Sequence, residues 1–434
     1  MSNRNAFILV VSLFFMWGFI TVIVDAFIPR LKDVFELSYL QAGLVQFAWF
    51  TAYGLLGIPG GLLIKKIGYQ KGIIVALSIC ALGCLLFWPA AHFRVFGFFL
   101  SALFVLAGGI TVLQVAANPY IAVLGEARLA SSRLNLAQAI NSFGTTIAPI
   151  FAATYLLSDT ILSQDEQKAL SETKLEAYRM AEAGAVKGPF LALAAVFGII
   201  ALFFLIQRLP KIINPESKGS YAEVFQNTKL KIGALLIFLY VGTEVAIGSF
   251  IVNYGLSLEI DSAIAASPLL NKLSLFAASL SGKTLTEMDP KAIIGALVTL
   301  YWGGAMIGRF IGSYLTAQFP PHRILAIFAA IAAFLVAATI SASGITSILF
   351  LLSIGLFNSI MFPTIFTLAI DDLGDQKPQG SGILVTAICG GAFIPPAVGA
   401  IADVTSFPVA FILPLICYMI IAGLANHYLG QASN

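Results

Sequence analysis

The sequence contains little charge and little cysteine. Of its 434 residues, 10% are Asp, Glu, Lys or Arg, whereas 59% are hydrophobic. Soluble domains carry about 25% charged residues, which keep their surfaces hydrated. This shortage excludes a soluble enzyme, a nucleic-acid-binding protein and a disordered regulator. The 4 cysteines lie within apolar runs, so neither a disulfide framework nor a cysteine metal site is indicated.

Signatures of several classes of membrane protein are missing as well. The sequence has no glycine-rich phosphate loop with its lysine, which excludes an ATP-driven pump. The histidines His92, His322 and His427 fall at the ends of apolar runs, which argues against a proton relay, a haem or a metal site. The sequence shows neither a repeated selectivity filter nor a cluster of catalytic groups at a membrane interface. We therefore expect neither an enzyme nor a bound cofactor.

Long apolar runs are what the sequence has in place of charge. A helix needs about 20 apolar residues to cross a bilayer, whereas barrel strands alternate over about 10 residues. The runs and their breaks predict twelve transmembrane helices, at residues 7–29, 41–64, 72–91, 95–124, 134–157, 189–207, 232–256, 292–317, 324–341, 347–370, 380–402 and 409–429. The fold class is therefore all-α and integral to the membrane.

Lysine and arginine are concentrated in alternate loops, which sets the predicted orientation. By the positive-inside rule, both termini lie in the cytoplasm. The long loops 158–188 and 257–291 then lie outside, and we expect them to form short amphipathic helices over the outer face. The basic linker 208–231 lies inside and divides the chain into two halves of six spans each, residues 1–207 and 232–434.

Glycine and proline recur at matching places in the two halves. Pro119 in the fourth span is followed by Gly144 in the fifth, and Pro363 in the tenth is followed by Gly391 in the eleventh. Two parallel repeats with a binding site between them near the membrane midplane are typical of secondary transporters. The sequence therefore predicts a transporter, although glycine and proline are common in membrane helices generally.

Three charged side chains lie inside predicted spans. A charge at bilayer depth costs at least about 2.5 kcal/mol, so it faces a partner, a cavity or a substrate. Glu244 is in the middle of the seventh span, where we interpret it as a cation-coupling acid or substrate acceptor, with a structural ion pair to Arg309 as the alternative. Asp25 in the first span is interpreted as a second coupling carboxylate or as an interfacial anion that balances the charge of Arg30.

Polar amides share helix faces within otherwise apolar spans. Gln114 and Asn118 are four residues apart, so they lie on one face of the fourth span. A stripe in the fifth span follows helical spacing, and comprises Gln138, Asn141, Ser142 and Thr145. Such amides line a polar cavity or form hydrogen bonds between helices. The length of the stripe favours a cavity.

Aromatic rings and amides together suit a sugar, because a sugar presents apolar C–H faces and a ring of hydroxyls. Trp17 lies one to two turns before Asp25 on the first span, and Trp49 and Trp302 are further candidates for stacking. Asn358 is the polar residue in the middle of the tenth span, where cavity lining and a structural role are equally compatible with its position.

Several segments together resemble the fucose:proton symporter family of the major facilitator superfamily. They are LFFMWGFITVIVDAFIP, LQVAANPYIAVLG, RLNLAQAINSFG, LYVGTE and FPTIFTLAIDDLG, and they extend over nearly the whole chain. GLLIKKIGYQKGI resembles the superfamily's loop between spans two and three, with Lys65 in place of the usual Asp. Within the family, the chain is similar to the glucose/galactose transporter branch.

The resemblance implies a major facilitator fold and import of hexoses by cation symport with alternating access. It implies a monomer in the bacterial inner membrane, with sugar and lipid as partners and no nucleic acid. Asp25 matches the family's coupling aspartate, and Trp17, Gln138 and Asn141 match positions that line its sugar cavity. Gln114 stands where the fucose carrier has a glutamate, so we hypothesise that Glu244 takes over part of that role.

Coupling and gating residues remain open between alternatives. We favour H⁺ as the coupling ion, with Na⁺ close behind, since oxygen donors suit hard cations generally. Candidate Na⁺ ligands are Asp25, Thr21, Gln114, Asn118 and Glu244, and candidate gating residues are Arg309, Lys65 and Lys66. For Arg309, a charge that snorkels to the inner end of its helix is the alternative. An uncoupled facilitator, a drug or sugar antiporter and a membrane sugar sensor are the alternative functions.

Overall fold

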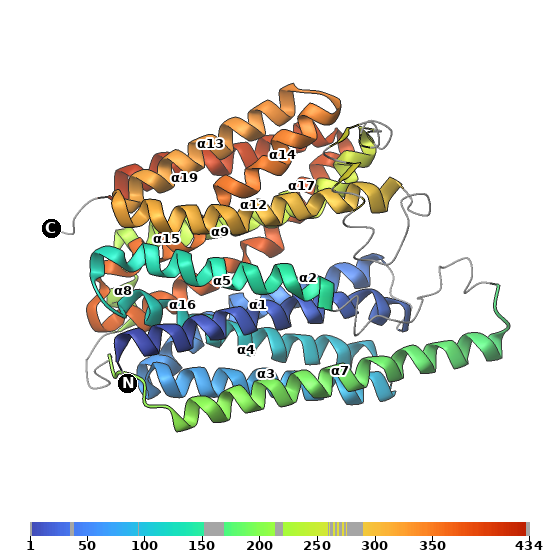
Figure 1. Ribbon diagram of the computed structural model, residues 1–434, viewed down its shortest axis with the longest axis horizontal. Coiled ribbons are helices and arrows are strands. Elements are labelled where there is room, and N and C mark those ends of the chain that lie inside the picture. The colour runs from blue at the N-terminus through green and yellow to red at the C-terminus, as the bar shows by residue number, and fades with distance from the viewer. Residues whose placement is uncertain are drawn as a thin grey trace.

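The computed structural model describes residues 2–34, 39–93, 95–151, 169–212, 220–258 and 290–430, with isolated residues between 259 and 289. Every regular element within these ranges is a helix, and the long helices run side by side in one bundle (Figure 1). The two ends of the chain lie at the same end of this bundle, which we call the termini end. The all-helical prediction is therefore confirmed.

The described helices correspond to the twelve predicted spans. The first six are α1 (Asn3–Val34), α2 (Tyr39–Ile67), α3 (Tyr69–Phe93), α4 (Phe96–Val123), α5 (Ala130–Phe151) and α7 (Glu172–Ile206). The last six are α9 (Thr228–Ser257), α12 (Pro290–Gln318), α13 (Pro321–Ser341), α14 (Gly344–Asn358) with α15 (Met361–Ile370), α16 (Lys377–Thr386) with η5 (Ala387–Cys389) and α17 (Gly390–Val404), and α18 (Phe407–Ala410) with α19 (Ile412–Tyr428). Three short helices lie in the connections: η1 (Ala127–Leu129), α8 (Tyr221–Val224) and η4 (Asp371–Gln376).

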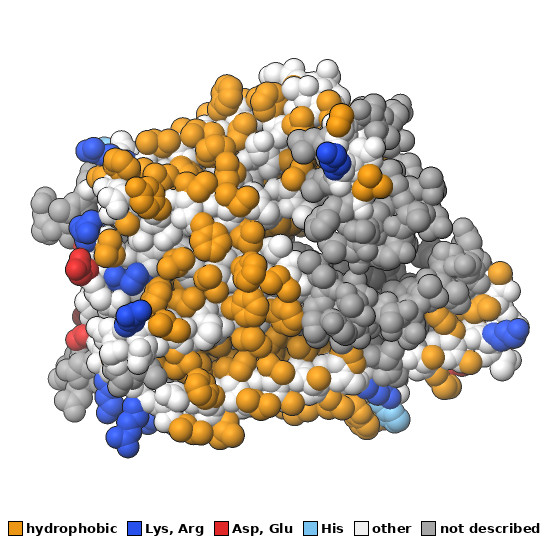
Figure 2. Space-filling model, in the orientation of Figure 1, with side chains coloured by type: hydrophobic (Ala, Val, Ile, Leu, Met, Phe, Trp, Pro, Cys, Tyr) orange, Lys and Arg blue, Asp and Glu red, His pale blue; other side chains and the backbone are white. Residues whose placement is uncertain are grey.

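Apolar side chains cover the middle of the bundle, and many of the Lys and Arg side chains on the visible face gather at the termini end (Figure 2). Among the described residues, nine stretches are long and apolar enough to cross a membrane. One of them, Gly344–Val404, contains both the tenth and the eleventh span. α5 and α12 are not among the nine stretches; α5 carries the polar stripe, and α12 carries Arg309. These two helices pack against each other in the interior.

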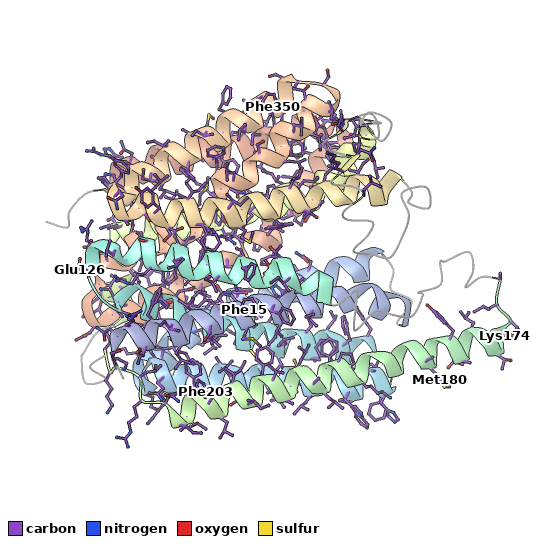
Figure 3. All side chains as sticks on the ribbon, viewed as in Figure 1. Phe15, Glu126, Lys174, Met180, Phe203 and Phe350 are labelled. Carbon is purple, nitrogen blue, oxygen red and sulfur yellow. The ribbon has the colours of Figure 1, made fainter. Side chains whose placement is uncertain are left out.

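The sixth span differs from the prediction. We expected short helices across the outer face within residues 158–188, but residues 172–188 continue the sixth helix, which extends beyond the bundle (Figure 1). Figure 3 labels Lys174 and Met180 on this extension. Its sequence, ETKLEAYRMAEAGAVK, is rich in strong helix formers and contains no proline, so nothing ends the helix there. Residues 158–168 and most of 257–291 lie outside the described residues.

Contacts between the two sets of six helices follow the predicted repeat. α2 packs against α16, η5 and α17, and α5 packs against α12. α2 and α12 are the second and eighth spans, and α5 and α16 belong to the fifth and eleventh. In the predicted repeat, the second span corresponds to the eighth and the fifth to the eleventh, so the two contacts are equivalent. The domain boundaries at 207 and 232 stay a prediction, and α9 begins within the predicted linker, at Thr228.

The tenth and eleventh spans, which we expected to be continuous, are broken at mid-length. The tenth turns at residues 359–360, between α14 and α15, and the eleventh passes through the 3-10 turn η5. Pro363 follows the first break as the third residue of α15. Proline has no N–H for the carbonyl four residues earlier and is tolerated in the first turn of a helix, so a new helix begins there.

Hydrogen bonds join the two sets of helices at the termini end. Asn135 donates to Thr364 at 3.1 Å, and the hydroxyls of Ser131 and Thr367 are 2.7 Å apart. The Ser381 hydroxyl of α16 donates to the carbonyl oxygen of Val115 in α4 at 2.9 Å. In the connection between the two sets, Tyr221 of α8 donates to the carbonyl oxygen of Ile58 in α2 at 2.7 Å. The bundle is therefore closed at the end that carries the termini.

Candidate substrate and cation site

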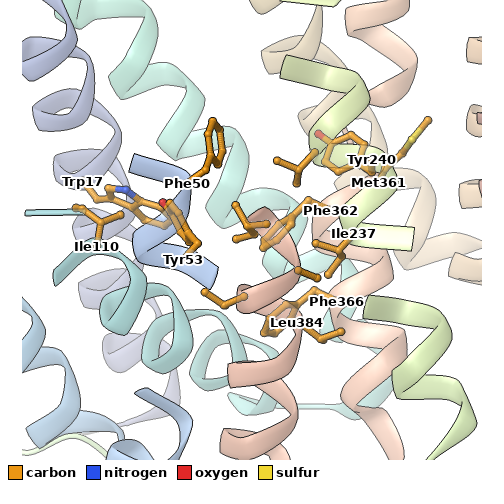
Figure 4. Close-up of a cluster of buried hydrophobic side chains, with 14 of the residues drawn as sticks. Trp17, Phe50, Tyr53, Ile110, Ile237, Tyr240, Met361, Phe362, Phe366 and Leu384 are labelled. Atoms are coloured by element: carbon orange, nitrogen blue, oxygen red, sulfur yellow. The ribbon is translucent and has the colours of Figure 1, made fainter. Parts of the chain in front are cut away.

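A cavity of about 170 Å³ lies between the two sets of helices, next to both helix breaks. We call it the central cavity. Its lining residues come from seven segments and are Trp17, Gln114, Gln138, Tyr240, Val241, Glu244, Arg309, Phe362, Pro363 and Ile388. In Figure 4, Trp17 and Tyr53 face Phe362 and Tyr240 from opposite sides of the interface. The structure thus brings together five of the predicted site residues, Trp17, Gln114, Gln138, Glu244 and Arg309.

Glu244 and Arg309 form an ion pair in this cavity. Arg309 Nη2 and Glu244 Oε1 are 3.7 Å apart, and the two side chains are 14% and 13% exposed. That distance is too long for a hydrogen bond, and Glu244 Oε1 has no hydrogen-bond partner among the described residues. A buried carboxylate oxygen without a partner is costly, so this atom is available to a proton, a cation or a hydroxyl.

Arg309 has two further partners, which draw it into the bundle and away from the helix end. Its Nε donates to the carbonyl oxygen of Ser359, at the break in the tenth span, at 3.2 Å. Its Nη1 donates to the hydroxyl of Ser142 in α5. One guanidinium therefore connects α9, α12 and the tenth span to a helix of the first half. This arrangement contradicts the alternative of a snorkelling charge.

Two predicted amides lie on the opposite wall, and one of them contacts a third. Gln114 and Gln138 line the central cavity, and Gln114 Nε2 donates to the hydroxyl of Tyr53 at 2.7 Å. Gln138 Nε2 donates to Asn118 Oδ1 at 3.5 Å, while Asn118 Nδ2 has no partner among the described residues. The amides on this wall carry no charge, which suits a neutral, hydroxyl-rich ligand.

The polar stripe of α5 divides between the two roles considered for it. Gln138 faces the central cavity, and Ser142 binds Arg309. Asn141 Nδ2 instead donates to the carbonyl oxygen of Phe14 in α1 at 2.8 Å, which is a hydrogen bond between helices. Its part in sugar binding stays a prediction.

Asn358 lies behind the cavity wall and is fully buried. Its Nδ2 donates to the hydroxyls of Tyr301 at 2.7 Å and Tyr418 at 3.2 Å. The Tyr301 hydroxyl donates in turn to the backbone carbonyl of Glu244 at 3.3 Å. Asn358 thus contacts the turn that carries the cavity carboxylate through a tyrosine that the sequence reasoning missed.

A second cavity of about 330 Å³ lies farther from the termini end, about one helical turn beyond the central cavity along α1 and α9. We call it the distal cavity. Its lining includes Trp49 of α2 and Trp302 of α12, from opposite halves, with Thr21 and Ser249 as polar groups. Thr21 Oγ1 donates to the carbonyl oxygen of Trp17 at 2.9 Å. The structure is therefore hollow on the side away from the termini.

The proposed cation ligands are only partly placed by the structure. Asp25 belongs to α1, but its side chain lies outside the described residues. Thr21 lines the distal cavity, Gln114 and Glu244 line the central one, and Asn118 lines neither. Among the described residues, no cluster of three His, Cys, Asp or Glu side chains that could hold a metal is found.

The predicted gating residues occupy two levels of the bundle. Lys65 and Lys66 are in the last turn of α2, at the termini end, and Lys66 is exposed. Arg309 is in the central cavity. The sequence reasoning missed the short polar contacts of Asn135, Ser131 and Ser381 between the halves, because single hydroxyls and amides give no signal until the facing helices are known.

Comparison with known proteins identifies the family. Residues 6–291 match the Major Facilitator Superfamily. The chain belongs to this family. It is 45% identical to a glucose/galactose transporter of Brucella abortus over 94% of this chain and 90% of the relative. It is 33% identical to the L-fucose-proton symporter of Escherichia coli over 99% and 94% of the two chains.

The fold is also similar to solved structures of this superfamily. A crystal structure of the Escherichia coli fucose:proton symporter covers 100% of both chains with a TM-score of 0.87 at 31% identity. A structure of the same transporter in the outward conformation gives the same TM-score and identity. These similarities confirm the major facilitator fold and the family resemblance.

Proposed function

We propose that this chain imports hexoses of the glucose or galactose type by symport with protons. The observation that carries the proposal is a Glu244 carboxylate oxygen that lies 3.7 Å from Arg309 in a cavity between the two halves and has no hydrogen-bond partner among the described residues. Relatives named as glucose/galactose transporters and L-fucose-proton symporters support the substrate class and the coupling ion.

The cavity chemistry suits a neutral sugar. The indole of Trp17 offers a face for the apolar side of a pyranose, and Gln114 and Gln138 offer donors and acceptors for its hydroxyls. Phe362 adds an apolar ring without a hydroxyl to the cavity lining, and the chain is 45% identical to a glucose/galactose transporter but 33% identical to an L-fucose-proton symporter. We therefore favour glucose and galactose over L-fucose.

Glu244 and Asp25 are the proposed coupling carboxylates. Protonation of Glu244 removes its attraction for Arg309, and the loss of net charge makes closure of apolar walls around the site less costly. We favour H⁺ over Na⁺ because the candidate Na⁺ ligands with described side chains are divided between two cavities.

Alternating access follows from the asymmetry of the bundle. The halves are hydrogen-bonded at the termini end and enclose cavities on the other side. With both termini cytoplasmic in a bacterial inner membrane, this is the outward-facing state. Inward release requires the contacts at the termini end to break. We infer that the monomer is sufficient, since the site is built within one chain.

The test is uptake of labelled D-glucose and D-galactose into proteoliposomes, with an inward H⁺ gradient or an inward Na⁺ gradient imposed separately. We expect accumulation with H⁺ alone, and its loss in Glu244→Gln and Asp25→Asn. Accumulation with Na⁺ alone would make the carboxylates ion ligands. Equilibration of sugar without accumulation would indicate a facilitator. Loss of sugar driven by an outward cation gradient would indicate an antiporter, and sugar binding without uptake would indicate a sensor.

A further inference from the structure

The break in the tenth span creates an unusual backbone acceptor beside the central cavity. In an uninterrupted helix, the N–H of residue 363 would donate to the carbonyl oxygen of Ser359. Residue 363 is proline, which has no N–H, so this carbonyl is left without its helical donor. A carbonyl at this depth needs another partner, because the membrane interior supplies none.

Arg309 supplies that partner. Its Nε donates to Ser359 O at 3.2 Å, while Nη1 reaches Ser142 and Nη2 faces Glu244 Oε1. A guanidinium is planar and rigid, so fixing Nε also fixes the directions of the two terminal nitrogens. The carbonyl released by Pro363 therefore sets the orientation in which Arg309 meets Glu244.

The residue before the turn fixes the other member of the pair. Asn358 ends α14 and donates to the hydroxyl of Tyr301, which donates to the backbone carbonyl of Glu244. Asn358 and Tyr301 are 0% exposed, and Asn358 Oδ1 has no hydrogen-bond partner among the described residues. A buried amide with an unpaired oxygen destabilises the fold, which argues that it is kept for another purpose.

We propose that the break in the tenth span is a positioning device for the Glu244–Arg309 pair, in which Pro363 orients Arg309 and Asn358 holds the Glu244 turn. This inference rests on the proposed proton symport, which it deepens by naming what sets the proton affinity of Glu244. Pro363 acts on the pair through the Ser359 carbonyl and Arg309, and Asn358 acts on it through Tyr301.

The groups that face Glu244 come from three helices. Tyr240 lies one turn earlier on α9, Arg309 and Tyr301 come from α12, and Tyr418 comes from α19. Among these, Arg309 carries the charge that favours the ionised carboxylate. A change that loosens Arg309 therefore makes Glu244 bind its proton more readily.

The experiment compares Pro363→Ala with the parent protein, using the full chain in proteoliposomes. Alanine restores an N–H at position 363, which competes with Arg309 for Ser359 O. We expect the pH midpoint of proton-driven sugar uptake to rise by about one unit, which corresponds to about tenfold in proton affinity. Tyr301→Phe removes the hydroxyl that binds the Glu244 carbonyl, and we expect a smaller shift in the same direction.

Pro119→Ala is the matched control. Pro119 is the corresponding proline of the fourth span, and the carbonyl it releases, Val115 O, is bound by Ser381 and not by Arg309. We expect this variant to change the rate of uptake without moving the pH midpoint. Equal midpoints for Pro363→Ala and the parent, in a protein that is monodisperse and still binds sugar, would overturn the inference.

A second measurement does not depend on transport. The melting temperature of the purified protein is recorded against pH for Pro363→Ala, Glu244→Gln and the double variant. If Pro363 acts on the ion pair, its effect depends on pH and disappears in the Glu244→Gln background. If the effects of the two substitutions on the melting temperature add at every pH, the inference is refuted, whether or not protons drive transport. If the parent protein shows no proton-driven uptake, only the proposed function is refuted.

Discussion

Two prolines at corresponding places in the halves, Pro119 and Pro363, lead to different contacts. Each removes the helical donor for the carbonyl four residues earlier, which is Val115 O in the fourth span and Ser359 O in the tenth. Val115 O accepts from Ser381 of the opposite half, whereas Ser359 O accepts from Arg309 of its own half.

The two carbonyl partners therefore serve two different purposes, contact between the halves and orientation of a side chain in the central cavity. In the fourth span, the released carbonyl joins the halves at the termini end. In the tenth, it orients a charged side chain in the central cavity. The same backbone feature thus contributes to a contact between the halves in one span and to the central cavity in the other. The side chain that binds the released carbonyl makes the difference.

Arg309→Ala breaks the tenth-span arrangement and has the largest expected effect. It leaves Glu244 without its cation and Ser359 O without a donor, so we expect a loss of about 3 kcal/mol in stability, measured by denaturant or thermal unfolding. Arg309→Lys keeps the charge but not the planar fork, and should recover only part of the loss. A loss no greater than that of Arg323→Ala, an exposed arginine, would contradict this account.

Ser381→Ala breaks the fourth-span arrangement. The Val115 carbonyl is left buried without a partner in the closed termini end, at a cost of about 1–3 kcal/mol. At about 1.4 kcal/mol, the population with that end open rises tenfold. Distances between spin labels at positions 66 and 323 measure the change. Ser353→Ala is the control, because Ser353 is exposed and binds only within its own helix. An equal response from both variants would count against a specific closing contact.

Tyr221→Phe removes a hydrogen bond to a carbonyl that no proline has released, and it has the smallest expected effect. Its hydroxyl joins the connecting helix α8 to α2 of the first half, but Ile58 O belongs to the continuous helix α2 and keeps its helical donor. We expect a destabilisation of about 0.5–1 kcal/mol in the closed state, from the same spin-label distances. Burial raises the pKa of the Tyr221 phenol, so it stays protonated and the effect should not vary between pH 6 and about pH 9. A larger effect than Ser381→Ala would reverse the order proposed here.

Features confined to one helix were predictable from the sequence. The spans follow from apolar length, because the bilayer requires every backbone group to be paired within the segment. Glu244 and Arg309 stood out because charge at that depth is costly, and the ion pair that the structure shows is one of the two interpretations the sequence allowed. The role of Glu244 in coupling remains to be tested.

Features that depend on facing helices were not predictable. Pro363 is compatible with a kinked helix or with a new first turn, so the sequence alone does not place the break at residues 359–360. Asn358 has no polar neighbour along its own helix, and its partners Tyr301 and Tyr418 are about sixty residues away on either side. The polar stripe of α5 is visible in the sequence, but its division between the cavity and α1 is not.

The placement of the tryptophans gives this protein an optical probe of its own. Of its 4 tryptophans, Trp17 lines the central cavity and Trp49 and Trp302 line the distal one. Trp88 is distant from both and lies near the ammonium of Lys187, 5.7 Å from the centre of its ring. Three of the 4 tryptophans therefore border the cavities between the halves. Ligand occupancy should be readable from unmodified protein, in real time and without an attached dye.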